Sequence, residues 1–281
     1  MKENLKNQPT VVVLVFTHKP DLDWYEEISL RQCQKVLGHY PIHLVCPEGL
    51  DISALLKLAP SLVPGYVPKR WLASIEAYNR FKISSWLYRR FRKYDFLLTH
   101  ELDAFVFRDE LMEWCHEGWD YIGAPWFEGW ENATAESPFI GVGNSGFSLR
   151  RTEPCLRSSR AVEWVQRLSP PRLYRSAKFQ KLIPNGRLRD LLKLAGYTDQ
   201  HEDDFWAGFA PEAFPDLRIA PYERAKHFSL EANARHIIRE SQSGMPFGCH
   251  AWHRCDTEFW RPWIEAEGHQ WPEMLKAAIA S

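Results

Sequence analysis

The sequence of 281 residues has no long apolar run, no paired-cysteine motif and almost no net charge. No stretch of about 18 consecutive apolar residues occurs, so we expect no transmembrane segment. None of the six cysteines stands in a C-x-x-C pair, which argues against a zinc ribbon or a thioredoxin-like motif. The formal net charge of −1 provides no basic field for a polyanion, so we expect no nucleic-acid partner.

The amino terminus also lacks the apolar segment of a secretion signal, because its first ten residues, MKENLKNQPT, are polar. We therefore expect a cytoplasmic location, and we leave open a peripheral position at the inner face of the membrane. The composition is that of a globular protein, with 45% hydrophobic and 25% charged residues. We expect residues 1–9 to be flexible and the whole chain, 1–281, to form a single domain.

The first fifty residues alternate between strand and helix patterns. Val11–Phe16 is an uninterrupted apolar run rich in valine, typical of a strand that is buried on both faces. Trp24–Leu37 has the apolar spacing of a helix and ends before a glycine, and Ile42–Cys46 predicts a second strand. This β-α-β order predicts an α/β fold with a mostly parallel central sheet flanked by helices.

The middle of the chain is less regular. Apart from a short helix near Ser53–Leu58, residues 51–70 are rich in proline, and we expect no strand there. One long helix is predicted over Leu72–Phe91, with Lys82 on its apolar face. Residues 126–140 contain glycine, glutamate and aromatic residues without periodicity, and we expect them to form a loop that closes over a site.

Two acids follow a predicted buried strand, at Glu101 and Asp103. The carboxyl edge of an open α/β sheet is where ligands bind, and carboxylate oxygens there suit Mg²⁺ or Mn²⁺. The alternative is a surface turn with two solvated acids. His250 and His253 lie in a loop rich in glycine and tryptophan, where a histidine can be either structural or a metal ligand.

Two further segments contain residues that are typical of phosphate-binding or catalytic sites. Gly141–Gly146 is either a tight turn before a strand or a backbone nest for phosphate. It lacks the spacing of a dinucleotide-binding loop. Three acids, Glu202, Asp203 and Asp204, stand at a predicted helix start, where they either complement the helix dipole or include a general base.

The order of these segments resembles that of GT-A-type nucleotide-sugar-dependent glycosyltransferases. The matching strings are YDFLLTHELDAFVF, WDYIGAPW, VGNSGFSLR and EDDFW, and the resemblance covers roughly residues 10–260. They look most like an uncharacterised bacterial family of predicted glycosyltransferases. The chain departs from the D-x-D pattern of this fold by having Glu101 at the first acid.

The resemblance implies roles for individual residues. It implies that Asp103 and Glu101 bind the metal, completed by His250 with His253 in reserve, and imidazole would favour Mn²⁺ over Mg²⁺. It implies that Asp203 is the catalytic base and that Glu202 binds or orients the acceptor. The residues expected to bind the donor are Thr17, His18, Lys82, Asn144, Ser145 and Gly146. Those expected to contact the acceptor are Asp204, Trp206 and Trp252.

The expected function is the metal-dependent, inverting transfer of a hexosyl-like sugar in polysaccharide biosynthesis. The donor would be a nucleoside diphosphate sugar, in the first place a UDP-sugar, bound by residues 10–150. A glycan or lipid-linked saccharide acceptor would be bound by residues 151–281. Three alternatives stay open: a retaining transferase of the same fold, a non-catalytic carbohydrate-binding protein, and a metal-dependent phosphohydrolase.

Overall fold

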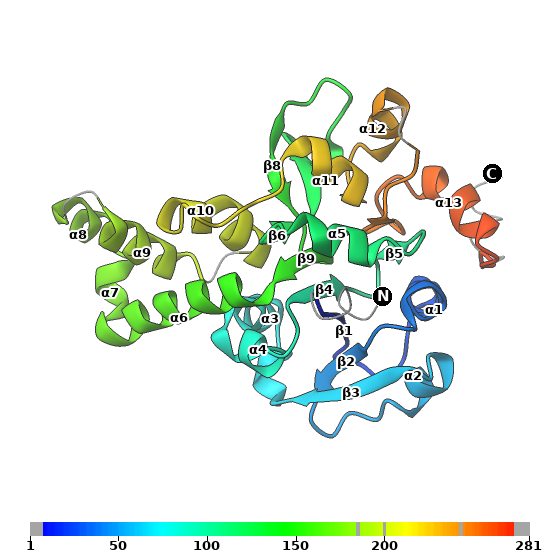
Figure 1. The fold of residues 1–281 in the computed structure, drawn as a ribbon, viewed down its shortest axis with the longest axis horizontal. Coiled ribbons are helices and arrows are strands. Elements are labelled where there is room, and N and C mark those ends of the chain that lie inside the picture. The colour runs from blue at the N-terminus through cyan, green and yellow to red at the C-terminus, as the bar shows by residue number, and fades with distance from the viewer. Residues whose placement is uncertain (1–7, 184–185, 199–200, 242–243, 273–281) are drawn as a thin grey trace.

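A six-stranded sheet forms the centre of the chain in the computed structural model, which describes residues 8–183, 186–198, 201–241 and 244–272 (Figure 1). Residues 1–7 of the terminus expected to be flexible lie outside these ranges. The strands, in spatial order, are β3 (Leu62–Val67), β2 (Ile42–Pro47), β1 (Val11–Phe16), β4 (Phe96–His100), β9 (Phe147–Arg151) and β6 (Tyr121–Ile122). The first four run parallel and β9 is antiparallel to both of its neighbours. The predicted α/β fold with a mostly parallel sheet is confirmed.

Helices cover both faces of this sheet (Figure 1). In the first half they are α1 (Trp24–Leu37), α2 (Ser53–Leu58), α3 (Ile75–Ile83), α4 (Ser85–Arg90) and α5 (Leu111–Glu117), with the 3-10 helices η2 (Lys69–Trp71) and η3 (Trp130–Asn132). Alternate residues of β1 point into two apolar cores. Val13 lies in the core shared with α1 and α2, and Val12 lies in the core shared with α3, α4 and α6. The apolar run of β1 is therefore buried on both faces, as predicted.

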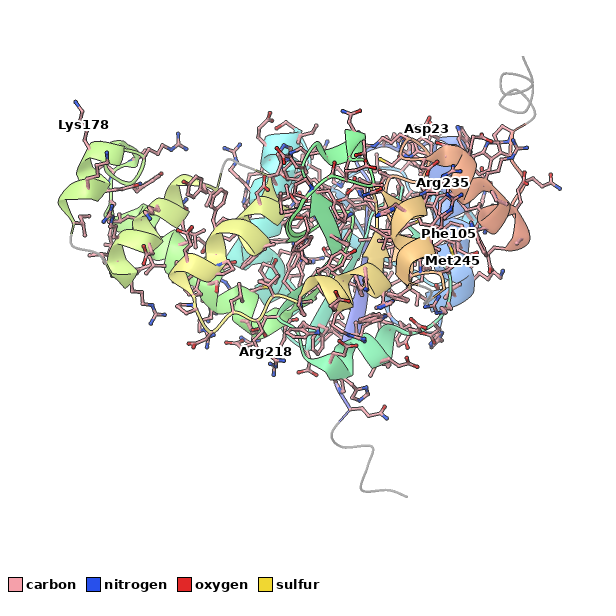
Figure 2. The ribbon with its side chains drawn as sticks, turned by 90° about the horizontal axis from the view of Figure 1, so that it is seen from above. Asp23, Phe105, Lys178, Arg218, Arg235 and Met245 are labelled. Atoms are coloured by element: carbon pink, nitrogen blue, oxygen red, sulfur yellow. The ribbon has the colours of Figure 1, made fainter. Side chains whose placement is uncertain are left out.

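The second half of the chain is mostly helical. Its elements are α6 (Thr152–Leu168), α7 (Pro171–Tyr174), α8 (Ala177–Leu182), α9 (Arg187–Gly196), the π-helix η4 (Asp204–Phe209), α10 (Ala210–Ala213), α11 (Tyr222–Phe228), α12 (Ala234–Ser241) and α13 (Thr257–Ala266). Helices α7 to α9 lie at one end of the molecule, and Figure 2 shows Lys178 of α8 far from Asp23 and Arg235 at the other end. A helix was predicted to start at the acids Glu202, Asp203 and Asp204, and the structure shows the π-helix η4 beginning at Asp204.

Two small sheets complete the fold. Strands β10 (Ser229–Leu230), β11 (Gly248–Cys249) and β5 (Phe105–Val106) form one, which joins the segment after β4 to the carboxyl-terminal part of the chain. Strands β7 (Ala124–Phe127) and β8 (Phe139–Gly143) form an antiparallel hairpin. Among the described residues, none of the helices is both long and apolar enough to cross a membrane.

Two sequence predictions of local structure are wrong, and a third is partly changed. Leu62–Val67 forms β3, although it contains proline and glycine, because an edge strand tolerates a missing donor on its open side. The predicted long helix breaks at Ser84, whose backbone is extended between α3 and α4. Residues 126–140 are partly ordered as the β7–β8 hairpin, and their closure over a site stays a prediction.

Candidate functional site

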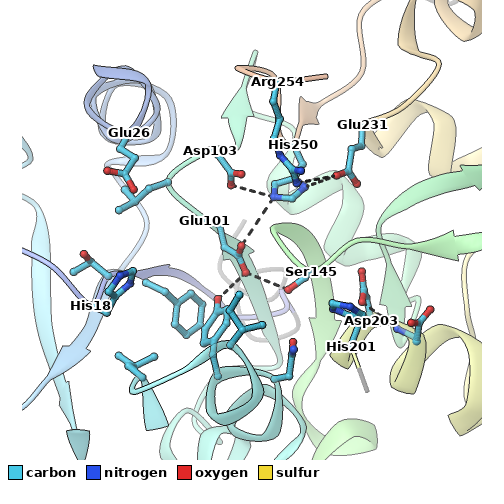
Figure 3. Close-up of a pocket in the computed structure, with 18 of the residues that line it drawn as sticks. His18, Glu26, Glu101, Asp103, Ser145, His201, Asp203, Glu231, His250 and Arg254 are labelled. Carbon is cyan, nitrogen blue, oxygen red and sulfur yellow. Dashed lines mark hydrogen bonds and ion pairs between the residues drawn. The ribbon is translucent and has the colours of Figure 1, made fainter. Parts of the chain in front are cut away.

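A cavity of about 960 Å³ opens at the carboxyl ends of β1 and β4. Thr17 and His18 follow β1 and line it, and Glu101 and Asp103 follow β4 and line it as well. The other wall comes from the second half of the chain, including Asp203 and Glu231 (Figure 3). The size is that of a small-molecule site, and the place is the edge at which open α/β sheets bind ligands.

Glu101, Asp103 and His250 converge in this cavity. Each offers a ligand atom, and these atoms lie within 4.8 Å of one another. The Nε2 atom of His250 lies 3.0 Å from Oδ1 of Asp103 and 4.0 Å from Oε2 of Glu101. The small sheet of β10, β11 and β5 brings His250 here, because β11 ends at Cys249 and β5 follows the two acids directly.

The electrostatics of the cluster keep both acids ionised. Burial alone would raise the pKa of Asp103, but the nearby imidazole of His250 holds it well below its usual value. Burial would also raise the pKa of Glu101, but the nearby Lys82 ammonium outweighs this effect, and the pKa of Glu101 is lowered. Burial would lower the pKa of His250, but the carboxylates of Asp103 and Glu231 raise it well above the usual value.

This donor set fits a divalent cation. Two carboxylates and one imidazole are the ligands of Mn²⁺ or Mg²⁺ sites that also bind phosphate oxygens. Gly146 leaves room at the cluster, since a Cβ atom there would lie 2.0 Å from Nε2 of His250. His253 stands apart from this set and stacks on the Tyr25 ring, with ring centroids 3.8 Å apart.

Glu231 holds the opposite side of the His250 ring. Its Oε1 lies 3.3 Å from Nδ1 of His250, and its Oε2 accepts a 2.9 Å hydrogen bond from Nδ2 of Asn144. A carboxylate on one ring nitrogen orients the ring, so that the other nitrogen faces Asp103 and Glu101. Sequence analysis missed Glu231, because it lies between two short elements in a segment without a motif.

Asn144 is buried, and its side chain stabilises the loop before β9 instead of lining the cavity. Its backbone has φ of 107°, and its Oδ1 accepts hydrogen bonds from the backbone N–H groups of Gly146 and Phe147. The expected direct contact of Asn144 with the donor sugar is therefore corrected, because no part of its side chain is exposed. Gly146 makes room for His250, and Ser145 alone of the three lines the cavity.

Lys82 is buried beneath the cavity and joins its two acidic motifs. Its Nζ lies 2.8 Å from Oε1 of Glu101 and 2.9 Å from Oε1 of Glu202. It also donates to the Ser145 hydroxyl and carbonyl. The expectation that Lys82 meets the donor diphosphate is corrected, since its ammonium is enclosed by these groups and is 0% exposed.

Glu202 is likewise absent from the cavity wall. It is 0% exposed, and its Oε1 lies 2.7 Å from Nη2 of Arg150. Burial would raise the pKa of Glu202, but Arg150 and Lys82 together lower it. The expectation that Glu202 contacts the acceptor is corrected. Arg150 and Glu202 thus form a buried ion pair.

Asp203 and Asp204 line the cavity at the start of the π-helix. Burial, followed by the negative charges of Glu202 and Asp204, raises the pKa of Asp203 to about 6. Burial also raises the pKa of Asp204. A carboxylate with a pKa near 6 is charged at neutral pH and is a better proton acceptor than an ordinary aspartate.

The tryptophans expected to contact the acceptor lie in the protein core. Trp206 packs edge-on against Tyr88, and Trp252 packs edge-on against Trp24. Both side chains are 0% exposed, so neither reaches a ligand in this structure. Trp126 and Trp130 of the β7–β8 hairpin line the cavity instead.

Solved glycosyltransferase structures have a similar fold. Galactosyltransferase LgtC, in complex with donor and acceptor sugar analogs, aligns over 95% of this chain and 99% of its own, with a TM-score of 0.51 and 12% identity. The apo form of mouse xyloside xylosyltransferase 1 aligns over 85% of this chain and 97% of its own, with a TM-score of 0.50 and 11% identity. These likenesses show that the chain has the GT-A fold.

Sequence comparison identifies a family without assigning an activity. No curated protein matches the chain. The model of one family, described as a protein of unknown function (DUF5672), matches residues 64–250, which include both acidic motifs and end at His250. The chain therefore belongs to the DUF5672 family.

Proposed function

We propose that the chain is a metal-dependent glycosyltransferase that uses a nucleoside diphosphate sugar, in the first place a UDP-sugar. The observation that carries the proposal is one cavity, in a GT-A fold, that combines two different groups of acids. Glu101 and Asp103 form a cation site with His250, and Asp203 has a pKa of about 6. The first group suits a diphosphate and its cation, and the second suits the activation of a hydroxyl group.

Each residue of the site has a separate role in the proposed reaction. Asp103 and His250 hold Mn²⁺ or Mg²⁺, with Glu101 as a third ligand, and the bound cation stabilises the negative charge of the leaving diphosphate. Asp203 removes the proton from the acceptor hydroxyl as its oxygen attacks the anomeric carbon. Glu231 orients the His250 ring, and Lys82 keeps the charges of Glu101 and Glu202 balanced below the cavity.

The remaining parts of the proposal concern the substrates. Thr17, His18 and Ser145 contact the donor, and Asp204 contacts the acceptor, because these residues line the cavity. Residues 10–150 bind the nucleotide sugar and residues 151–281 bind the acceptor. The acceptor is a glycan or a lipid-linked saccharide in polysaccharide biosynthesis, and the reaction inverts the anomeric centre, because a positioned base such as Asp203 serves an inverting displacement.

Calorimetry of UDP binding with and without Mn²⁺ tests the proposal. We expect UDP to bind in the presence of Mn²⁺, and Asp103→Ala to abolish the Mn²⁺-dependent part while circular dichroism stays unchanged. Asp51→Ala is the control, because Asp51 is exposed and bonds only locally, to Ser53. Equal binding by the wild type and Asp103→Ala would show that the cation site is misassigned.

A further inference from the structure

Two tryptophans stand at the cavity on the β7–β8 hairpin. Trp126 lies in β7 and is half-buried, and Trp130 is 51% exposed. Their ring centroids are 5.3 Å apart, and the rings meet at 60°. Both line the cavity that holds the acids, although neither contributes to its charge.

The backbone of Trp130 is strained, and Trp126 packs closely against its partner strand. Trp130 has φ of 53°, a left-handed conformation that a bulky residue rarely adopts. Trp126 lies so close to the backbone of Gly143 that a Cβ atom there would be 1.7 Å from its ring. Burial cannot account for Trp130, since half of it is in solvent. A strained, exposed tryptophan at a cavity points to a ligand that covers it.

The hairpin belongs to the side of the cavity that carries Asp203. Strand β8 packs against the π-helix η4, which begins at Asp204. Figure 3 shows His18, from the loop after β1, and Asp203 on opposite sides of the candidate cation site around His250. Under the proposed function the base contacts the acceptor, so side chains on the hairpin that packs against η4 are placed for the acceptor and not for the nucleotide.

We propose that Trp126 and Trp130 form the acceptor subsite and stack against a pyranose ring. A pyranose offers an apolar face of C–H groups and a rim of hydroxyl groups, and an indole ring covers such a face. Asp203 and Asp204 line the same cavity and would accept hydrogen bonds from the rim hydroxyl groups. This inference rests on the proposed function and adds to it that the saccharide acceptor is recognised through the apolar face of a sugar ring.

A glycan array probed in the presence of UDP and Mn²⁺ tests the subsite, with UDP binding measured separately by calorimetry. The variants are Trp130→Ala, Trp130→Phe and the control Trp164→Ala, which removes an indole that is 59% exposed on α6. We expect Trp130→Ala to weaken glycan binding roughly tenfold. Trp130→Phe should restore much of it, Trp164→Ala should leave it unchanged, and UDP binding should be the same in all variants.

Three results would overturn the subsite. Glycan binding that is equal in Trp130→Ala and Trp164→Ala would show that the indole contacts no sugar. A loss of UDP binding in Trp130→Ala would place a nucleobase there instead. A wild type that binds UDP with Mn²⁺ but no glycan would exclude a saccharide acceptor and leave the nucleotide site intact. Failure of the proposed function is a different result, in which the wild type does not bind UDP with Mn²⁺.

Discussion

The acid pair after β4 and the acid pair at the start of the π-helix are built in the same way around one lysine. In the first pair Glu101 contacts Lys82, and Asp103 faces His250 in the cavity. In the second pair Glu202 contacts Lys82, and Asp203 lines the cavity. Each glutamate is thus paired with the same buried ammonium, and each aspartate lines the cavity without contacting that lysine.

The two aspartates differ because of what surrounds them. Asp103 is partly buried next to the imidazole of His250, and its pKa is held below the usual value. Asp203 is partly buried next to two other carboxylates, and its pKa is raised to about 6. A carboxylate that stays ionised suits a metal ligand, whereas one with a raised pKa suits proton transfer. Under the proposed function, the same residue type would therefore serve two purposes in one cavity.

Glu202→Gln should have the largest effect on stability, because Glu202 is the more deeply buried of the two glutamates that contact Lys82. The substitution removes the anion between Lys82 and Arg150, and breaking a buried ion pair costs about 3–5 kcal/mol. Unfolding by guanidinium chloride measures the loss. Glu267→Gln is the matched control, since Glu267 pairs with the exposed Lys35 and should contribute no more than about 1 kcal/mol. Equal losses in both variants would refute the role of Glu202.

Asp203→Asn should have the largest effect on activity. It keeps the shape and removes the proton acceptor, so kcat should fall by at least about 10²-fold while donor binding changes little. The wild-type rate should also fall as the pH drops below about 6, because the base must be ionised. Steady-state kinetics across pH measure both effects.

Asp204→Asn is the control for this experiment and should be much less damaging. If Asp204→Asn lowers kcat more than Asp203→Asn does, the catalytic base is Asp204 and not Asp203. A product that retains the anomeric configuration of the donor, observed by NMR, would remove the need for a base.

The sequence predicted the sheet and the site acids better than it predicted what the acids contact. Strand β1 and helix α1 follow from local apolar patterns, and Asp103 follows from its place after a buried strand. The contact between Lys82 and Glu202 spans 120 residues of chain, and no local pattern encodes it. A buried lysine on an apolar helix face was the only available signal.

The tryptophans show the same limit. Trp206 and Trp252 stand beside acidic or histidine motifs, yet both are core residues. Trp130 stands in a segment without periodicity, yet it lines the cavity. Tertiary packing decides which face of an element is buried, and sequence proximity to a motif does not. Glu231 was missed for a related reason, since only the small sheet brings it to His250.

Glu231→Gln should weaken the cation site without removing a ligand. The amide has one oxygen where the carboxylate has two, and it carries no charge. It cannot both form the ion pair with Nδ1 of His250 and accept the hydrogen bond from Asn144, so the imidazole loses its fixed orientation. The loss of such a supporting carboxylate typically costs about 10- to 100-fold in metal affinity. Electron paramagnetic resonance of Mn²⁺ measures the affinity. Glu26→Gln is the control, because Glu26 lines the same cavity but pairs with Lys19. Equal Mn²⁺ affinity in the two variants would exclude the role of Glu231.

Asp203→Asn should also stabilise the fold, which is the opposite of what Glu202→Gln does one residue earlier. The pKa of Asp203 is about 6 in the folded chain, above the value of about 3.9 expected when the chain is unfolded. Between these two pH values the folded state binds more protons than the unfolded state, so stability falls as the pH rises through this window. Asparagine cannot ionise, so the variant does not lose this stability as the pH rises.

At pH 7 the Asp203→Asn variant should therefore be more stable than the wild type, by on the order of 1–2 kcal/mol. At pH 4 most of that difference should be gone, because the wild-type carboxyl is then protonated in the folded state. Guanidinium chloride unfolding at the two pH values measures the change. A variant that is no more stable than the wild type at pH 7 would show that the Asp203 carboxylate is well solvated, and it would remove the physical reason for choosing Asp203 over Asp204 as the base.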